Sequence, residues 1–140
     1  MDDLCARSQT LIAARFDMIH FDTNFLIQTV VAGSAAHEKF RGWAQAQETC
    51  NASSIAWAEF LCGPLDAAAE NIARQIFPSP EPFLPADAVL AARLFNQTGR
   101  RSRSLADCMI AAVAIRCGAK LATSNTADFQ PFLPHGLLLT

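Results

Sequence analysis

The sequence predicts an α/β fold in which a mainly parallel sheet is covered by helices on both faces. Short apolar segments typical of buried strands alternate with longer helical segments, and no internal repeat occurs along the chain. The composition agrees, because 51% of the 140 residues are hydrophobic and only 17% are charged, which provides a substantial core. This length fits one domain, which we place at residues 18–140 after an N-terminal extension over residues 1–17.

Capping and turn residues mark the boundaries of the expected elements. The polar pair Asp22–Thr23 follows the first apolar run and suits a helix N-terminus, as do Ser53 or Ser54 and Ser104 further on. Gly118 ends the last long helix. In order, we expect a strand over 18–21, helices over 24–31 and 34–47, an extended segment over 49–53, a helix from 54 towards 63, a helix over 66–76, a proline-rich break at 78–82, helices over 85–97 and 105–117, and strands over 120–123 and 136–139.

Charge and cysteine content exclude several classes of protein. Eleven Lys and Arg against thirteen Asp and Glu give a net charge of −2, so the chain lacks the basic surplus needed to bind nucleic acid through charge alone. The longest apolar run, Cys108–Ile115, is far shorter than the roughly 20 residues of a membrane span. The five cysteines form an odd set with no C-x-x-C pair and no histidines at zinc-ligand spacing, so we interpret them as small hydrophobic residues in a reducing compartment. Because the chain opens Met1-Asp2-Asp3 rather than with a secretory leader, we expect a cytoplasmic location.

Four acidic residues stand alone in otherwise uncharged, apolar segments. Each of these segments contains a single charged residue, and the four are Asp22, Glu59, Asp107 and Asp128. Each also lies near the expected carboxyl end of a strand or in the first turns of a helix. Ligands of parallel α/β sheets bind outside the carboxyl ends of the strands, so we expect the four acids to meet there, away from the ordinary solvated surface.

A divalent cation would explain such a group of carboxylates. Like charges repel one another, and an ionised carboxylate in an apolar setting is costly unless something satisfies it. Oxygen ligands without His or Cys favour Mg²⁺ or Mn²⁺ over zinc. Local alternatives remain open: Asp22 and Asp107 also suit helix capping, and Asp128 also suits a solvated turn. Glu59 has the weakest structural explanation, because apolar side chains surround it in the sequence.

The other candidate residues are weaker. Arg100, Arg101 and Arg103 form the one basic cluster and directly precede the helix that carries Asp107. A solvated loop is the ordinary interpretation, and an edge that contacts phosphate is the functional one. No Gly-rich phosphate loop and no Ser/His/Asp arrangement can be assembled. Three histidines are scattered without partners for acid–base chemistry: His20, His37 and His135.

The sequence around the acids closely resembles the four signature segments of PIN-domain nucleases, in the style of the VapC toxins of toxin–antitoxin pairs. The segments are residues 22–26 (DTNFL), 59–63 (EFLCG), 107–114 (DCMIAAVA) and 123–129 (TSNTADF). They occur in order, within a match that runs from about Met18 to Leu139. One segment alone would be a weak signal, whereas four in sequence are fairly specific.

This resemblance implies a three-layer α/β/α sandwich and a Mg²⁺- or Mn²⁺-dependent endoribonuclease. It further implies an RNA substrate, a cognate antitoxin whose tail covers the acidic groove, and a homodimer. The implied metal ligands are Asp22, Glu59, Asp107 and Asp128, with Asp22 and Asp107 the most direct. The residues implied to hydrogen-bond around the site or to shape it are Asn24, Thr123 and Asn125.

The chemistry of such a site predicts the products. A metal ion lowers the pKa of a bound water, which can then attack phosphorus in line, so we expect 5′-phosphate and 3′-hydroxyl ends. A 2′,3′-cyclic phosphate would instead indicate a metal-free mechanism. Setting aside the four site acids leaves more basic than acidic residues, and the rest of the protein is then mildly attractive to RNA.

Two other functions fit parts of the sequence. A phosphatase or phosphotransfer domain would use Asp22 as its nucleophile, but the haloacid-dehalogenase type needs a second Asp two residues on, where this chain has Asn24. A non-catalytic binding module would keep the acids for folding or partner capture. Its partner groove would use the apolar residues of the first helix, Phe25, Leu26, Val30 and Val31, although such a face more often belongs to the core.

Overall fold

The structure, a computed structural model, describes residues 17–99 and 104–140. Most of the N-terminal extension expected over residues 1–17, and the basic cluster of Arg100, Arg101 and Arg103, lie outside the described residues. Within them, four short strands form one sheet in which all neighbouring strands run parallel, as the sequence predicts. The strands are β1 (Met18–Phe21), β2 (Thr49–Ala52), β3 (Lys120–Ala122) and β4 (Leu138–Leu139).

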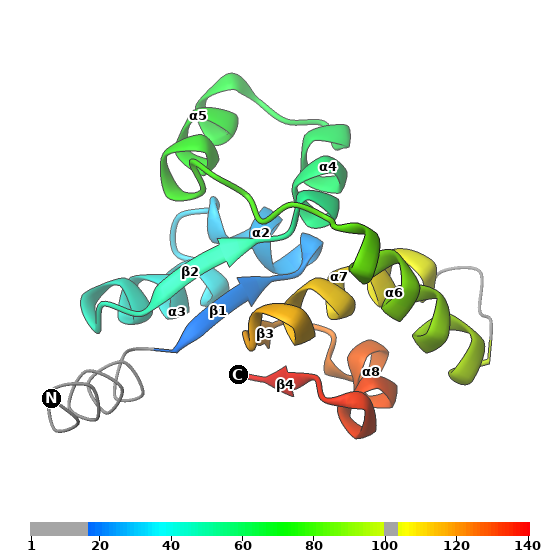
Figure 1. The fold of residues 1–140 in the computed structure, drawn as a ribbon. Helices are drawn as coiled ribbons and strands as arrows, with labels where there is room; N and C mark the ends of the chain where they lie inside the picture. The colour runs from blue at the N-terminus through cyan, green and yellow to red at the C-terminus, as the bar shows by residue number, and fades with distance from the viewer. Residues whose placement is uncertain (1–16, 100–103) are drawn as a thin grey trace, which may run out of the picture.

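The order of the strands is β2-β1-β3-β4, which places β1, the first strand of the described residues, inside the sheet between β2 and β3 (Figure 1). The last residue of β1, Phe21, lies opposite Ala52 of β2 and Ala122 of β3. Because the three strands run in the same direction and end in register, the segments that follow them leave the sheet at one common edge. The residues after β1, β2 and β3 are therefore neighbours.

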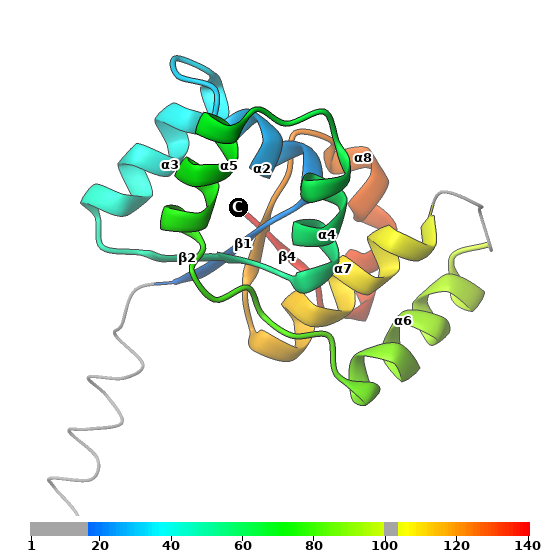
Figure 2. The same cartoon turned by 90° about the horizontal axis from the view of Figure 1, so that it is seen from above.

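In the described ranges, seven α-helices pack around this sheet. Figure 2 shows α2 and α3 on one face and α6 and α7 on the other, so the predicted three-layer α/β/α sandwich is confirmed. No helix in these ranges combines the length and apolar character needed to cross a bilayer. The helices are α2 (Thr23–Thr29), α3 (Ala35–Gln45), α4 (Ser54–Cys62), α5 (Ala67–Ile76), α6 (Pro85–Gln97), α7 (Ser104–Cys117) and α8 (Thr126–Phe129).

Most predicted boundaries hold to within a few residues, and the exceptions lie near the C-terminus. Helix α8 and the 3₁₀ helix over Gln130–His135 that follows it are not predicted from the sequence, and the last predicted strand is too long. A four-residue helix next to a segment with Pro131 and Pro134 carries no helical periodicity, so the pattern resembles an irregular turn. Ser104, which we expected to cap α7, is instead the first residue of that helix.

Side-chain caps fix where several helices begin. Each capping oxygen accepts a hydrogen bond from the backbone N–H three residues further along, which satisfies a group that the helix leaves unpaired. The caps and their donors are Asp22 with Phe25, Ser34 with His37, Ser53 with Ala56, and Asp66 with Ala69. Two of these caps directly follow strands β1 and β2, so the helices α2 and α4 start at the carboxyl edge of the sheet.

Aromatic side chains fill the core between the sheet and the α2–α3 layer. The ring of Phe21 lies 4.8 Å from that of Phe25, 5.3 Å from that of Phe77 and 5.8 Å from that of Trp43, measured between centroids. Because side chains alternate along a strand, the neighbouring His20 points to the opposite face, towards α7. The core therefore anchors both strand β1 and the start of α2.

On the other face, α7 is buried on nearly all sides. Cys108 and the run Ala111–Ala114 have exposed fractions of 0%. Small alanine side chains allow the sheet, α4 and α6 to approach this helix closely. Such packing holds the first turn of α7, which carries Asp107, in a fixed position.

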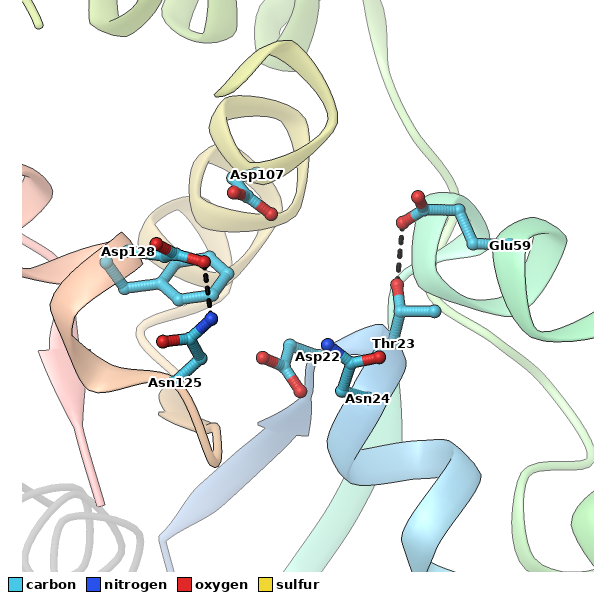
Figure 3. A pocket seen from close by; sticks show the side chains of 8 residues that line it. Asp22, Thr23, Asn24, Glu59, Asp107, Asn125 and Asp128 are labelled. Atoms are coloured by element: carbon cyan, nitrogen blue, oxygen red, sulfur yellow. Dashed lines mark hydrogen bonds between the residues drawn. The ribbon is translucent and has the colours of Figure 1, made fainter. Parts of the chain in front are cut away.

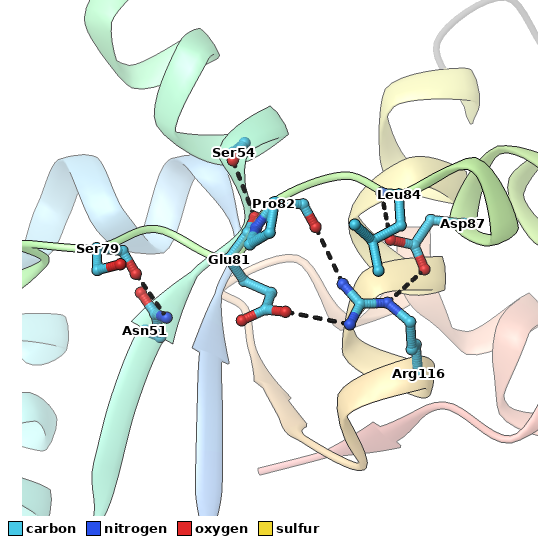
Figure 4. Close-up of polar contacts among 8 residues, drawn as sticks. All are labelled: Asn51, Ser54, Ser79, Glu81, Pro82, Leu84, Asp87 and Arg116. Atoms are coloured by element: carbon cyan, nitrogen blue, oxygen red, sulfur yellow. Dashed lines mark hydrogen bonds and ion pairs between the residues drawn. The ribbon is translucent and has the colours of Figure 1, made fainter.

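A strap formed by residues 78–84 joins α5 to α6 and is fastened to the sheet (Figure 4). The backbone of Glu81 donates to Ala52 O at 2.9 Å and accepts from Ser54 N at 2.7 Å. The strap therefore extends the sheet locally beside the end of β2, where α4 begins.

One arginine of α7 also binds the strap, at Glu81 and the residue after it (Figure 4). Arg116 pairs with Glu81 at 3.1 Å, donates to Pro82 O at 3.0 Å and donates through Nε to Asp87 Oδ1 at 2.8 Å. The other oxygen of Asp87 accepts from the backbone N–H of Leu84 at 2.8 Å and caps α6. The strap, α6 and α7 are thus joined through a single guanidinium group.

Candidate functional site

A cleft with a volume of about 130 Å³ opens at the carboxyl edge of the sheet. It brings together all four of the lone acids predicted from the sequence, although they come from four separate elements (Figure 3). Asp22 lies at the end of β1, with Glu59 of α4 on one side and Asp107 of α7 and Asp128 of α8 on the other. The lining residues are Asp22, Thr23, Asn24, Glu59, Asp107, Asn125, Asp128 and Phe129.

Asp22 is buried at the base of the cleft, with an exposed fraction of 4%. Its Oδ1 accepts from the backbone N–H of Phe25 at 2.8 Å, and its Oδ2 accepts from the hydroxyl of Thr123 at 2.5 Å. Burial raises the pKa of Asp22; the two hydrogen bonds oppose this change, and the negative charges of Glu59 and Asp128 add to it. Asp22 is therefore a helix cap and also part of the acidic group, so the two interpretations of this residue coexist.

Glu59 lies on the exposed side of α4, so the expectation that apolar neighbours enclose it is wrong. The helix buries Ala56 and Phe60 instead and turns Glu59 towards solvent at the cleft. Its Oε1 accepts a hydrogen bond from the hydroxyl of Thr23 at 2.6 Å (Figure 3). Apolar neighbours in a helical sequence do not imply burial, because neighbouring positions point in different directions.

The remaining two acids differ in exposure. Asp107 is partly buried in the first turn of α7, where the helix dipole favours a negative charge. Asp128 is exposed, and its Oδ2 accepts from the side-chain amide of Asn125 at 2.6 Å. The backbone N–H of Asn125 in turn donates to the hydroxyl of Thr123 at 2.9 Å. The prediction that all the acids avoid the solvated surface is therefore wrong for Glu59 and Asp128.

The residue types fit a hard divalent cation by their chemistry, since the side chains around the cleft offer carboxylate, amide and hydroxyl oxygens as ligands. The spacing is wider than that of a completed metal site. Among residues 17–99 and 104–140, no three His, Cys, Asp or Glu side chains lie close enough together to hold a metal ion. Three of the acids are instead tied to hydroxyl or amide donors, namely Asp22 to Thr123, Glu59 to Thr23 and Asp128 to Asn125.

Two cleft residues are missing from the predicted site, Thr23 and Phe129. Thr23 is recognisable in the sequence only as a neighbour of Asp22 suited to a helix start. Phe129 is buried and lines the cleft with its apolar ring, so it contributes shape rather than polar side-chain atoms. No local pattern indicates that the Thr23 hydroxyl reaches Glu59, because the two residues are 36 positions apart.

Comparisons with known proteins agree with this architecture. The family model for the PIN domain matches residues 19–130, and the chain therefore belongs to the PIN domain family. A comparison with curated protein sequences finds no match.

Solved structures with the same fold come from toxin–antitoxin complexes. The chain is similar to one in VapBC2 from Rickettsia felis bound to a promoter DNA fragment, with a TM-score of 0.67, 19% identity and coverage of 88% of this chain and 97% of that one. It is also similar to a chain in DNA-bound VapBC from Salmonella typhimurium, with a TM-score of 0.66, 19% identity and coverage of 90% of this chain and 98% of that one. For a chain in a toxin–antitoxin complex from Klebsiella pneumoniae, the TM-score is 0.63, the identity is 25%, and the match covers 80% of this chain and 90% of that one.

Proposed function

We propose that this protein is a Mg²⁺- or Mn²⁺-dependent endoribonuclease and the toxin of a toxin–antitoxin pair. The observation that carries the proposal is that four acids from four separate segments of a PIN domain line one cleft at the carboxyl edge of its sheet. Hydrolysis of a phosphodiester needs negative charge to be stabilised on phosphorus oxygens, and a cation held by carboxylates provides this stabilisation.

The acids have different proposed roles because their surroundings differ. Asp22 and Asp107 are the most rigid, one held by a strand end and a helix cap, the other by a buried helix, so we assign them as the direct ligands. Glu59 and Asp128 lie on the two sides of the cleft and complete the set. When bound, Mg²⁺ or Mn²⁺ supplies positive charge to the phosphodiester and makes water acidic enough to act as the nucleophile.

Neutral side chains support these acids. Thr123 holds Asp22 and Asn125 holds Asp128 through the hydrogen bonds already described. The amide of Asn24 also borders the cleft and carries both donors and acceptors, which suits contact with the sugar or phosphate of RNA. We propose that Arg100, Arg101 and Arg103, which precede α7 in the sequence, contact the RNA backbone.

The partner assignment rests on the solved relatives. Their structures are VapBC and other toxin–antitoxin complexes, and the present chain covers nearly all of the matched chains. We infer that a cognate antitoxin binds this protein and that the protein forms a homodimer in the cytoplasm. The family match and the acidic cleft support a nuclease as the activity that such an antitoxin would restrain.

A non-catalytic binding module is the second candidate, favoured by the wide spacing of the acids. Without a close set of three carboxylates among the described residues, the cleft could serve recognition rather than catalysis. A direct assay separates the two functions.

The experiment incubates purified, partner-free protein with total cellular RNA and Mn²⁺, with and without EDTA. Asp107→Asn is tested in parallel, and Asp66→Asn serves as the matched control, because Asp66 is an exposed cap on α5 outside the cleft. The proposed function predicts discrete cuts with 5′-phosphate and 3′-hydroxyl ends that disappear with EDTA and in Asp107→Asn only. No cutting by folded wild type would favour the binding module, and cyclic phosphate ends would exclude the metal mechanism.

A further inference from the structure

We propose that Thr23 is a positioning residue whose hydroxyl orients Glu59 and thereby sets how tightly the cleft binds a divalent cation. This inference depends on the proposed function and assigns a role to a residue whose sequence position indicates only a helix start. The inference rests on the hydrogen bond that Thr23 Oγ1 donates to Glu59 Oε1 at a distance of 2.6 Å.

Thr23 is a rigid donor because its place in the chain is fixed from both sides. It is the first residue of α2 and directly follows Asp22, whose side chain caps that helix through Phe25 N. The Asp22 backbone is itself tied to the sheet, since its N–H donates to Ala122 O at 3.1 Å. Thr23 therefore presents its hydroxyl from a fixed point at the base of the cleft.

The side chain of Glu59, in contrast to that of Thr23, has few contacts that fix its orientation. It is exposed on α4, and a glutamate that is not held samples several rotamers in water. Within the described part of the chain, Thr23 is its only hydrogen-bond partner. The contact selects one orientation of the carboxylate, in which Oε1 meets the hydroxyl and Oε2 keeps its lone pairs for another ligand (Figure 3).

The contact also joins two sides of the cleft. The donor belongs to α2 and the acceptor to α4, and among the described residues it is the side-chain hydrogen bond that links α4 to the other cleft elements. The charge of Glu59 already acts on Asp22, because it contributes to the raised pKa of that carboxyl. Fixing Glu59 therefore fixes part of the field that a cation meets beside Asp22. Groups that orient a metal ligand in this way typically change metal affinity about 10- to 100-fold when they are removed.

The test measures Mn²⁺ binding by calorimetry in the absence of RNA, so that affinity is read without catalysis. Thr23→Val removes the hydroxyl at nearly constant volume, and Thr23→Ser restores it. Thr98→Val is the matched control: Thr98 also donates its hydroxyl, to Leu94 O at 2.7 Å, but it lies at the end of α6. Circular dichroism checks that each variant keeps its secondary structure, and the Asp22 cap of α2 is unaltered in all of them.

We expect Mn²⁺ to bind Thr23→Val about 10- to 100-fold more weakly than wild type. Thr23→Ser should bind within about twofold of wild type, and Thr98→Val should be unchanged. Equal binding by wild type and Thr23→Val would overturn the role of Thr23 while leaving the proposed nuclease intact. Failure of the wild type to bind Mn²⁺ would overturn both the metal-dependent function and this inference. Equal weakening in Thr23→Ser and Thr23→Val would also reject the role of the hydroxyl.

Discussion

The hydroxyl of Thr123 donates to Oδ2 of Asp22 at 2.5 Å and joins the ends of β3 and β1 across 101 positions of sequence. This contact holds a buried carboxylate in place although burial raises its pKa. A side chain kept charged in such a position is costly for the fold. Stability and the proposed activity therefore oppose each other at Asp22.

Asp22→Asn should stabilise the fold at neutral pH and abolish RNA cleavage. The change removes a buried charge and its repulsion by Glu59 and Asp128, while the amide oxygen can still cap α2. We expect a gain of about 1 kcal/mol in the free energy of unfolding, a size common for relieving such sites. Urea unfolding without divalent ions measures it. A loss of stability would show that the Thr123 contact outweighs the cost of burial.

The same carboxyl gives a pH dependence with a defined sign. Because its pKa is higher in the folded than in the unfolded state, the folded protein binds more protons in the interval above the ordinary value of 3.8. The contribution of Asp22 to stability is thus largest at low pH and is lost as the pH rises through the raised pKa. The difference in unfolding free energy between Asp22→Asn and wild type should grow over this interval and then level off; a constant difference would contradict it.

Addition of Mn²⁺ should stabilise the wild type at pH 7. Binding to the folded state alone adds about 2.7 kcal/mol when the ion is at 100 times its dissociation constant. The melting temperature in Mn²⁺ and in EDTA measures this gain. Asp107→Asn should lose most of it, because Asp107 borders the cleft, and Asp66→Asn should keep it. Equal gains in all three proteins would place the ion elsewhere.

His20 should make the fold sensitive to mild acid. It has an exposed fraction of 1%, and neither ring nitrogen has a hydrogen-bond partner among the described residues. Burial lowers the pKa of His20 from 6.5 to about 4, with Glu81 opposing and Arg116 reinforcing the change. The unfolded chain therefore takes up a proton first, and stability is lost as the pH falls from about 6.5 towards 4.

The expected loss for His20 is about 2 kcal/mol between pH 7.5 and pH 5, from a slope near 1.4 kcal/mol per pH unit. Urea unfolding at the two pH values measures this loss in the free energy of unfolding. His20→Met removes the titrating group at similar volume, so its loss over the same interval should be smaller by about that amount. The same pH dependence in both proteins would assign the effect to other groups.

Arg116→Met should destabilise the protein by about 3 kcal/mol, the usual cost of leaving a buried carboxylate without its partner. Asp87 has a side-chain exposure of 1%, and Arg116 is its charged partner at 2.8 Å. The double variant Arg116→Met/Asp87→Asn should recover part of the loss, because the amide oxygen can still cap α6. Thermal unfolding of the single and the double variant measures this recovery. A double variant that is less stable than Arg116→Met would exclude the buried charge of Asp87 as the cause of the loss.

The sequence predicts what depends on local chemistry. Apolar runs predict β1, β3 and, with too great a length, β4, whereas β2 is expected only as an extended segment. Capping residues such as Asp22 and Ser53 predict helix starts to within about a residue. The group of four acids is also predictable, because parallel strands direct the segments that follow them to one edge. The PIN-domain resemblance, which the family comparison confirms, rests on the same residues.

What the sequence does not reveal are relationships between distant positions. The hydroxyl partners of Glu59 and Asp22 lie 36 and 101 residues away, and no local pattern records such a pairing. The exposure of Glu59 depends on which side of α4 faces the core, and this in turn depends on the packing of Ala56 and Phe60. The spacing of the acids is a property of the assembled cleft and not of any segment.

The central place of β1 in the sheet has a consequence for how the protein folds. Its residue Ile19 pairs with Cys50 on one side and with Lys120 on the other, so the second pairing must close a loop of about a hundred residues. Long-range parallel pairing is slow because the entropy of loop closure must be overcome before the contacts form. Strand β1, which Asp22 directly follows, meets strand β3, which Thr123 directly follows, only at this step. A partly synthesised chain therefore has no complete acidic cleft, and the proposed cutting activity can arise only once the most distant segments of the chain have met.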